Sequence, residues 1–122
     1  MPGAPVRSLL LVEDELLIAM DLEDVLRERG VADLTLAADY EQAAAALDAR
    51  AFDLVVFDLD LEGVSSLPLV EARHAAGGAS IVTSGYESPP RALAALGVPV
   101  LGKPVHVGDL REAAATLDLQ LG

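Results

Sequence analysis

Acidic side chains, a hydroxyl and a lysine follow the apolar runs of this sequence in a repeated way. Glu13 and Asp14 directly follow one apolar run, and Asp58 directly follows another. Ser84 ends a later run and Lys103, the only lysine of the chain, comes just after the last one. Carboxylates that lie within a few ångströms of one another repel unless a cation separates them, and Mg²⁺ prefers such oxygen ligands. The pattern therefore predicts a magnesium site made by Glu13, Asp14 and Asp58.

A carboxylate beside a divalent ion, a hydroxyl and an ammonium group is equipped for phosphoryl transfer. The carboxylate attacks in line, while the metal ion and Lys103 neutralise the phosphoryl oxygens. Ser84 can donate a hydrogen bond to one of these oxygens, and Gly85 leaves room for its backbone N–H to help. Each residue alone has a simpler explanation, since Asp14 is a typical helix cap and acids are common in turns. Their presence at four strand ends favours the phosphoryl-transfer interpretation.

The elements that must position these residues alternate regularly along the chain. Short apolar runs predict strands, and apolar residues at helical spacing predict a helix after each strand. The expected strands cover about residues 9–12, 34–36, 54–57, 81–84 and 98–101. The expected helices begin at Asp14, at Asp39, at Ser65 or Ser66, at Ser88 and near His106.

Five β-α repeats with continuous apolar strands indicate an α/β fold with a parallel sheet covered on both faces. Pro99 cannot donate a ladder hydrogen bond, so the last strand is expected at an edge. We therefore predict a doubly wound (βα)5, flavodoxin-like three-layer sandwich with strand order 2-1-3-4-5. In such sheets ligands bind beyond the carboxyl ends of the strands, where the acids, Ser84 and Lys103 would meet.

The composition limits the remaining classes of protein. The chain has 122 residues, which suits one domain over residues 1–122, with about 7–120 structured. It has 20 acidic and 8 basic residues, and the net charge of −12 disfavours nucleic acid as a direct partner. No cysteine is present, which excludes disulfides and thiolate metal sites. No apolar run or leader suggests a membrane span or export, so we expect a cytoplasmic protein.

These residues resemble the receiver domain of bacterial two-component response regulators over essentially the whole chain. The motifs that carry the resemblance are Leu9–Asp14, Asp53–Asp58, Thr83-Ser84-Gly85 and Lys103-Pro104, in this order and spacing. Each motif alone is weak, but together they are specific. The resemblance implies a phosphorelay module that is phosphorylated on an aspartate and is not an enzyme beyond its own phosphorylation and dephosphorylation.

The resemblance also implies a role for each matching residue. Asp58 is the phosphoacceptor, and Glu13, Asp14, Asp58 and the backbone carbonyl of Asp60 bind Mg²⁺ or Mn²⁺. Ser84 is the switch hydroxyl and Lys103 binds the phosphoryl group. Asp60 and Tyr86 occupy the positions that tune hydrolysis, and we expect the Tyr86 ring to shield the phosphoryl group from water.

Receivers take the phosphoryl group from a phosphohistidine of a sensor kinase or of a histidine phosphotransfer protein. With no output domain expected, a single-domain receiver must signal through another protein, through phosphorylation-dependent homodimerisation, or act as a phosphate shuttle or sink. The sequence departs from the family pattern where an aromatic switch residue is usual, since Val100 stands there. Glu62 replaces a common proline, and the fourth helix is short. The Ser-Gly-Tyr and Glu-Gly-Val-Ser-Ser segments resemble a subgroup of bacterial single-domain receivers.

Two other functions remain open at this point. Asp58-Leu59-Asp60 also resembles the nucleophile motif of haloacid-dehalogenase-like phosphohydrolases, which use Mg²⁺ and a lysine as well. Such motifs normally lie on the first strand of a larger chain. The second alternative is a pseudoreceiver, a binding module with this fold that works without phosphorylation, although the complete acid, hydroxyl and lysine set argues against it.

Overall fold

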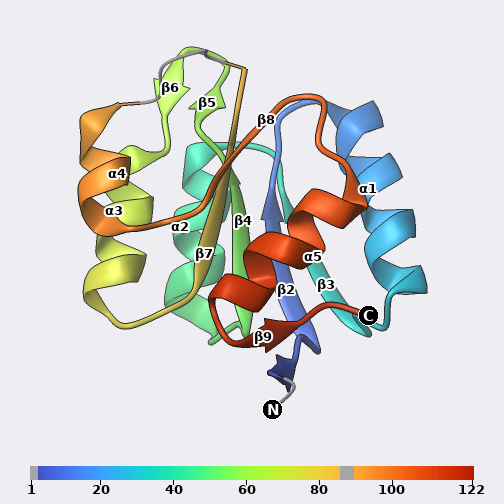
Figure 1. The fold of residues 1–122 in the computed structure, drawn as a ribbon. Coiled ribbons are helices and arrows are strands. Elements are labelled where there is room, and N and C mark those ends of the chain that lie inside the picture. Colours follow the sequence, from blue (N-terminus) through green and yellow to red (C-terminus); the bar gives the residue numbers. More distant parts are fainter. Residues whose placement is uncertain (1–2, 86–89) are drawn as a thin grey trace.

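The computed structural model describes residues 3–85 and 90–122 and shows a parallel sheet between two layers of helices (Figure 1). The five strands of the sheet lie in the order β3-β2-β4-β7-β8. They are β2 (Ser8–Val12), β3 (Asp33–Ala37), β4 (Leu54–Asp58), β7 (Ser80–Ser84) and β8 (Val100–Gly102). This is the predicted 2-1-3-4-5 order, and every neighbouring pair is parallel.

Helices cover both faces of the sheet, as the apolar strands predicted. Helices α1 and α5 pack on one face and α2, α3 and α4 pack on the other (Figure 1). Their bounds are α1 (Leu16–Glu28), α2 (Tyr40–Ala49), α3 (Leu67–Ala75), α4 (Arg91–Leu96) and α5 (Val107–Thr116). Because side chains alternate along a strand, Leu9 and Leu11 face α1 and α5, whereas Leu10 and Val12 face the other layer.

Two small sheets were not predicted from the sequence. The first pairs β1 (Ala4–Pro5) in parallel with β9 (Leu119–Gln120), at the end of the molecule where both termini lie (Figure 1). The second is the hairpin of β5 (Asp60–Leu61) and β6 (Val64–Ser65), directly after β4. Its turn residues Glu62 and Gly63 have φ angles of 53° and 85°, the pattern of a tight hairpin turn with two left-handed residues. This hairpin stands above the carboxyl end of the sheet.

The ends of the helices agree only in part with the predictions. Asp39 accepts a hydrogen bond of 2.8 Å from the Gln42 N–H, and Gln42 Oε1 accepts one from the Ala38 N–H, so Asp39 caps α2 where this helix was predicted to begin. The expectation that Asp14 caps the first helix was wrong, because Glu15 precedes α1 and makes no side-chain cap. The last strand begins at Val100, beyond Pro99, and lies at the expected edge. The predicted helix start at Ser88 lies outside the described residues.

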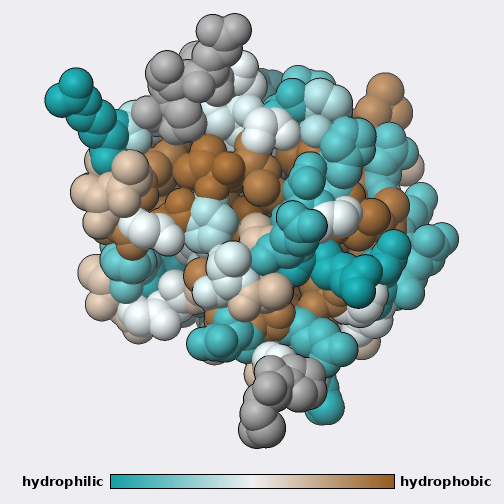
Figure 2. Space-filling model, in the orientation of Figure 1, coloured by the Kyte–Doolittle hydropathy of each residue, from teal (hydrophilic) through white to brown (hydrophobic). Residues whose placement is uncertain are grey.

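Apolar surface remains visible between two of the helices. Figure 2 shows a band of hydrophobic residues between α4 and α5, where β8 runs across the front of the molecule. Leu96, Val100 and Leu101 are each only half-buried. Within the described part of the chain, no helix has the length and apolar character needed to cross a membrane.

The start of β7 holds a buried hydroxyl whose removal we expect to stabilise the protein. Ser80 is 3% exposed, and its Oγ has no hydrogen-bond partner among the described residues. Burial removes the hydration of a polar group, and without a hydrogen-bond partner this cost is not compensated. We expect Ser80→Ala to raise the free energy of unfolding by about 1 kcal/mol in urea denaturation. Lower stability in this variant would show that the hydroxyl has a partner.

Asp53, just before β4, binds the backbone at the start of β2, and its contribution to the free energy of unfolding should depend on pH. Its Oδ2 accepts the backbone N–H groups of Arg7 at 2.9 Å and Ser8 at 3.1 Å, and these bonds lower the pKa of Asp53. Folding thus favours the ionised carboxylate. The stabilisation is complete above the ordinary pKa of about 4 and is lost as pH falls through the lower pKa of the folded state.

We therefore expect Asp53→Asn to lower the free energy of unfolding by on the order of 1 kcal/mol near neutral pH, a modest effect because the carboxylate is largely exposed. The difference from wild type should shrink below about pH 4. Urea denaturation of both proteins across this range measures it. A difference that does not change with pH would contradict the assignment.

Candidate functional site

A buried aspartate and a lysine form the centre of the site at the carboxyl end of the sheet. Asp58 is the last residue of β4 and is 3% exposed. The Lys103 ammonium donates a hydrogen bond of 2.9 Å to Asp58 Oδ2. Lys103 directly follows β8, and its own backbone N–H donates to the Ser84 carbonyl at 3.0 Å. The end of β7 thus holds the lysine backbone while the side chain reaches Asp58.

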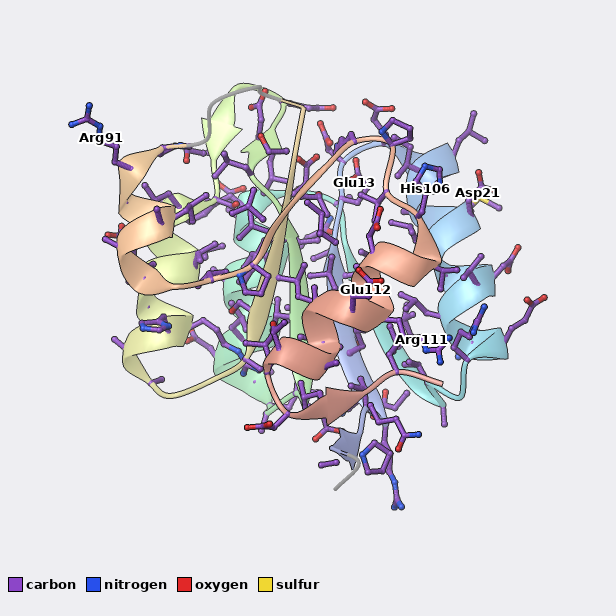
Figure 3. All side chains as sticks on the ribbon, viewed as in Figure 1. Glu13, Asp21, Arg91, His106, Arg111 and Glu112 are labelled. Atoms are coloured by element: carbon purple, nitrogen blue, oxygen red, sulfur yellow. The ribbon has the colours of Figure 1, made fainter. Side chains whose placement is uncertain are left out.

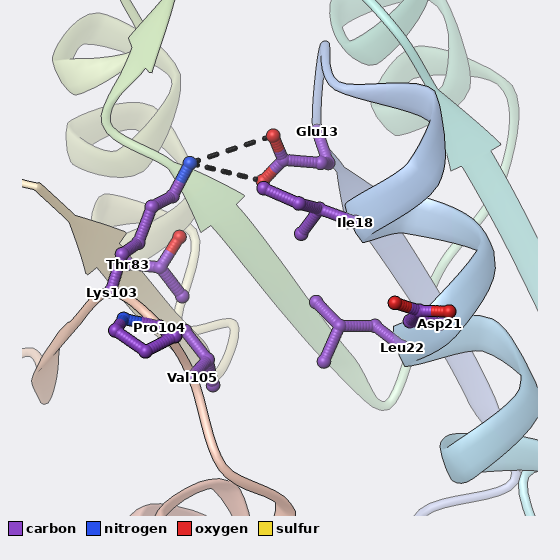
Figure 4. A pocket seen from close by; sticks show the side chains of 8 residues that line it. All are labelled: Glu13, Ile18, Asp21, Leu22, Thr83, Lys103, Pro104 and Val105. Atoms are coloured by element: carbon purple, nitrogen blue, oxygen red, sulfur yellow. Dashed lines mark hydrogen bonds and ion pairs between the residues drawn. The ribbon is translucent and has the colours of Figure 1, made fainter.

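Glu13 brings a second buried carboxylate to the same ammonium group. It follows β2, points inward from the upper end of the sheet in Figure 3, and its Oε2 lies 3.3 Å from Lys103 Nζ (Figure 4). By contrast, Arg91 at the start of α4 projects away from the molecule (Figure 3). Glu13 Oε1 also accepts the Glu15 N–H at 3.2 Å, which orients the carboxylate.

Three carboxylates come together as a metal ion would require. Glu13, Asp14 and Asp58 each offer an oxygen, and these oxygens lie within 4.8 Å of one another. Hard oxygen donors of this kind suit Mg²⁺, which binds through a few carboxylates and keeps several waters; Mn²⁺ accepts the same donors. The residues present therefore fit a divalent ion at the carboxyl end of the sheet.

Burial makes this arrangement costly for the negative charges. Burial, followed by the charge of Asp58, raises the pKa of Glu13 to about 7. Burial also raises the pKa of Asp58, although Lys103 counteracts this. Burial disfavours the ammonium of Lys103, but its hydrogen bonds and charge interactions with Asp58 and Glu13 together outweigh burial and raise the pKa of Lys103. The site therefore favours a further cation beside its carboxylates.

Asp60 contacts the Asp58 carboxylate through its backbone. Its N–H donates to Asp58 Oδ1 at 3.3 Å, whereas its own Oδ1 accepts the Gly63 N–H at 2.8 Å and closes the hairpin turn. The carboxylate of Asp60 is not among the three that cluster within the described residues. Metal binding by its backbone carbonyl stays a prediction.

The other predicted site residues lie on the neighbouring strands. Ser84 is buried at the end of β7, one residue beyond the pair that joins Asp58 to Thr83. Val100, at the expected position of an aromatic switch residue, is half-buried in β8. Tyr86, expected to shield the phosphoryl group, lies outside the described residues.

Two features of the site were missed from the sequence. Ser66 is fully buried and its hydroxyl donates to the Asp58 carbonyl at 2.7 Å; the only signal was a serine pair before Pro68. A pocket of about 170 Å³ also lies beside Lys103. Figure 4 shows its apolar wall, made by Ile18, Leu22, Pro104 and Val105. Ile18 and Leu22 belong to α1, so the apolar face of this helix lies beside Lys103.

The comparison with protein families agrees with this geometry. Residues 9–115 match the response regulator receiver domain. The chain therefore belongs to the response regulator receiver family, whose members are generally signalling modules of two-component systems. No curated protein matches the chain closely enough in sequence to be counted as a relative.

Solved structures with the same fold cover nearly the whole chain. The BeF3-activated SdrG of Pseudomonas melonis Fr1 is 28% identical, with a TM-score of 0.76 over 93% of this chain and 97% of that one. A CheY-like receiver domain of Methanospirillum hungatei is 25% identical, with a TM-score of 0.80 over 92% and 93%. TrrA of Thermotoga maritima, solved in complex with Mg(2+)-BeF, is 23% identical, with a TM-score of 0.79 over 91% and 98%.

The carboxylate cluster should make stability depend on divalent ions. We expect Mg²⁺ at tenfold its dissociation constant to add about 1.4 kcal/mol to the free energy of unfolding, which raises the Tm of a domain of this size by about 3–6 °C. Thermal denaturation with and without Mg²⁺ measures this shift, and Asp14→Asn should reduce it. Equal melting curves in a cooperatively melting wild type would count against the metal site.

Proposed function

We propose that Asp58 accepts a phosphoryl group from a phosphohistidine on a sensor kinase or histidine phosphotransfer protein. The observation that carries this proposal is the Lys103 ammonium, 2.9 Å from Asp58 Oδ2, beside the cluster of Glu13, Asp14 and Asp58. A buried carboxylate beside an ammonium, with two further acids that could hold a divalent cation, is arranged for a reaction whose negative charge these cations would neutralise.

Phosphoryl transfer to Asp58 needs a nucleophile and groups that neutralise the phosphoryl oxygens, and side chains of this protein supply most of them. An oxygen of Asp58 attacks the phosphorus, the bond from phosphorus to the donor's imidazole nitrogen breaks, and the imidazole leaves with the electron pair. Lys103 neutralises charge on the phosphoryl oxygens, and Ser84 donates a hydrogen bond to one of them. Glu13 and Asp14, with Asp58 and the Asp60 carbonyl, would hold Mg²⁺, which when bound neutralises further charge.

Loss of the phosphoryl group is proposed to occur by attack of water on the phosphoaspartate. Asp60 and Tyr86 would tune this step, since they occupy the positions that do so in the receivers this chain resembles. The Asp60 side chain is held in the hairpin turn by Gly63, so it presents a fixed carboxylate near the phosphoacceptor.

The exposed face of α1 supports a protein donor. Leu16 and Leu17 are 68% and 78% exposed, and Met20 is 49% exposed, on the first turns of the helix that follows Glu13 and Asp14. Exposed apolar residues gathered beside a reactive group are typical of a docking surface. We propose that the phosphodonor packs there while its histidine reaches Asp58.

The proposed output is a contact with another protein. The hydrophobic band in Figure 2 lies between α4 and α5, where β8 runs, and the apolar residues Val100 and Leu101 of β8 are half-buried. This band would bind a downstream protein or a second copy after phosphorylation. A shuttle or sink for phosphate is the simpler form of the same proposal, because it needs no output face. We further propose that residues 1–122 act as one receiver domain in the cytoplasm.

Phosphorylation of Asp58 can be tested directly by intact mass. We expect wild type incubated with acetyl phosphate and Mg²⁺ to gain one phosphoryl group, and Asp58→Asn to gain none, because the amide cannot serve as the acceptor. Acetyl phosphate consumption should stop near one equivalent apart from slow hydrolysis of the adduct. Size-exclusion chromatography of the same samples reports dimerisation.

Three outcomes would contradict the proposal. An adduct on both proteins would refute Asp58 as the acceptor. Rapid turnover of generic phosphate esters, abolished in Asp60→Asn, would favour a phosphohydrolase. An unmodified wild type would favour a pseudoreceiver.

A further inference from the structure

Two adjacent serines at the start of α3 have different partners. The Ser65 hydroxyl accepts the Leu67 N–H at 3.2 Å, as a capping side chain does. Ser66 directly precedes the helix but makes no side-chain cap. Its fully buried hydroxyl turns inward and donates to the Asp58 carbonyl at 2.7 Å, while its backbone N–H donates to the Leu59 carbonyl at 2.9 Å.

The Asp58 carbonyl lies where the sheet no longer supplies a ladder partner. The N–H of Leu59 donates to the Thr83 carbonyl in β7. Because the C=O and N–H of a trans peptide point in opposite directions, the Asp58 carbonyl points toward β2. The pairing of β2 with β4 ends at Val12 and Phe57, one residue earlier. A buried carbonyl requires a donor, and the Ser66 hydroxyl is that donor.

The peptide after the phosphoacceptor is therefore held from both sides. Its N–H is bound at 2.9 Å by β7 and its C=O at 2.7 Å by Ser66. This peptide determines where the Asp60 N–H lies, and that N–H donates to Asp58 Oδ1. Thr83 and Ser66 thereby keep the Asp58 carboxylate and the backbone of Asp60 in a constant relation.

We propose that Ser66 is a positioning residue for phosphoryl transfer to Asp58, a proposal that rests on the function proposed above. Its hydroxyl keeps its proton throughout. It acts by holding the peptide after Asp58, so that one carboxylate oxygen stays on Lys103 while the other faces the incoming phosphorus. Reactions of this kind are sensitive to misplacement of the attacking atom by even about 1 Å.

The test compares Ser66→Ala with Ser65→Ala. Each variant removes one hydroxyl at the start of α3. Ser65 loses its bond from the Leu67 N–H, whereas Ser66 loses its bond to the Asp58 carbonyl and a longer one of 3.4 Å to the Leu59 carbonyl, so only Ser66 touches Asp58. Phosphorylation by acetyl phosphate with Mg²⁺ is followed over a range of donor concentrations, well below the Tm of each protein. We expect Ser66→Ala to lower the maximal rate by about tenfold with little change in the half-saturating concentration. Ser65→Ala should retain both values within about twofold.

Two further variants separate positioning from stability. Ser66→Thr keeps the hydroxyl and should recover most of the rate. If Ser66→Ala does not fold, Ser66→Cys replaces it, and its weaker S–H donor should give a reduced maximal rate. Equal maximal rates for wild type, Ser65→Ala and the Ser66 variant, even with a lowered Tm, would overturn the proposal and leave Asp58 as the acceptor. A wild type that gains no phosphoryl group would instead overturn the proposed function itself.

Discussion

The site depends on how one ammonium group is held among buried carboxylates. Lys103 directly follows β8, whereas Asp58 lies on β4, two strands away with β7 between them. Neighbouring strands are about 4.8 Å apart, so the lysine side chain must cross the end of β7 to reach Asp58. Small residues allow this crossing, because Ser84 ends β7 and pairs with Gly102 of β8. The contact of Lys103 with Asp58 thus requires the strand order, the register and the small strand ends together.

Burial of the apolar strand residues offsets the free-energy cost of burying the charged groups of this site. Residues of β2 and β4 alternate between two hydrophobic clusters, one under α1 and α5 and the other under α2, α3 and α4. Polar side chains enter only at the ends, where Glu13 and Asp58 are buried in spite of the cost shown by their raised pKa values. A sheet covered by helices on both faces tolerates such charges at the carboxyl ends of its strands, where an ion can still enter from solvent.

The sheet, its order and the main site residues could be predicted because they depend on regular patterns. Continuous apolar runs mark the strands, and parallel strands bring their carboxyl ends to one edge. The hairpin was missed because its strands have two residues each and its Glu62-Gly63 turn is not a strong hairpin signal. The inward turn of Ser66 could not be predicted, since it depends on where β2 ends relative to Asp58.

Because Val100 is aliphatic, a conformational signal of the proposed phosphorylation would pass through the strands themselves. The Lys103 N–H donates to the Ser84 carbonyl, and Ser84 pairs with Gly102. A shift of Ser84 toward a phosphoryl group on Asp58 would therefore move the backbone of β8 directly. Val100 and Leu101 precede this point in β8 and are half-buried, and β8 runs where the apolar band lies between α4 and α5 (Figure 2). A small displacement of the strand would change how much of this band is exposed, without the rotation of an aromatic ring.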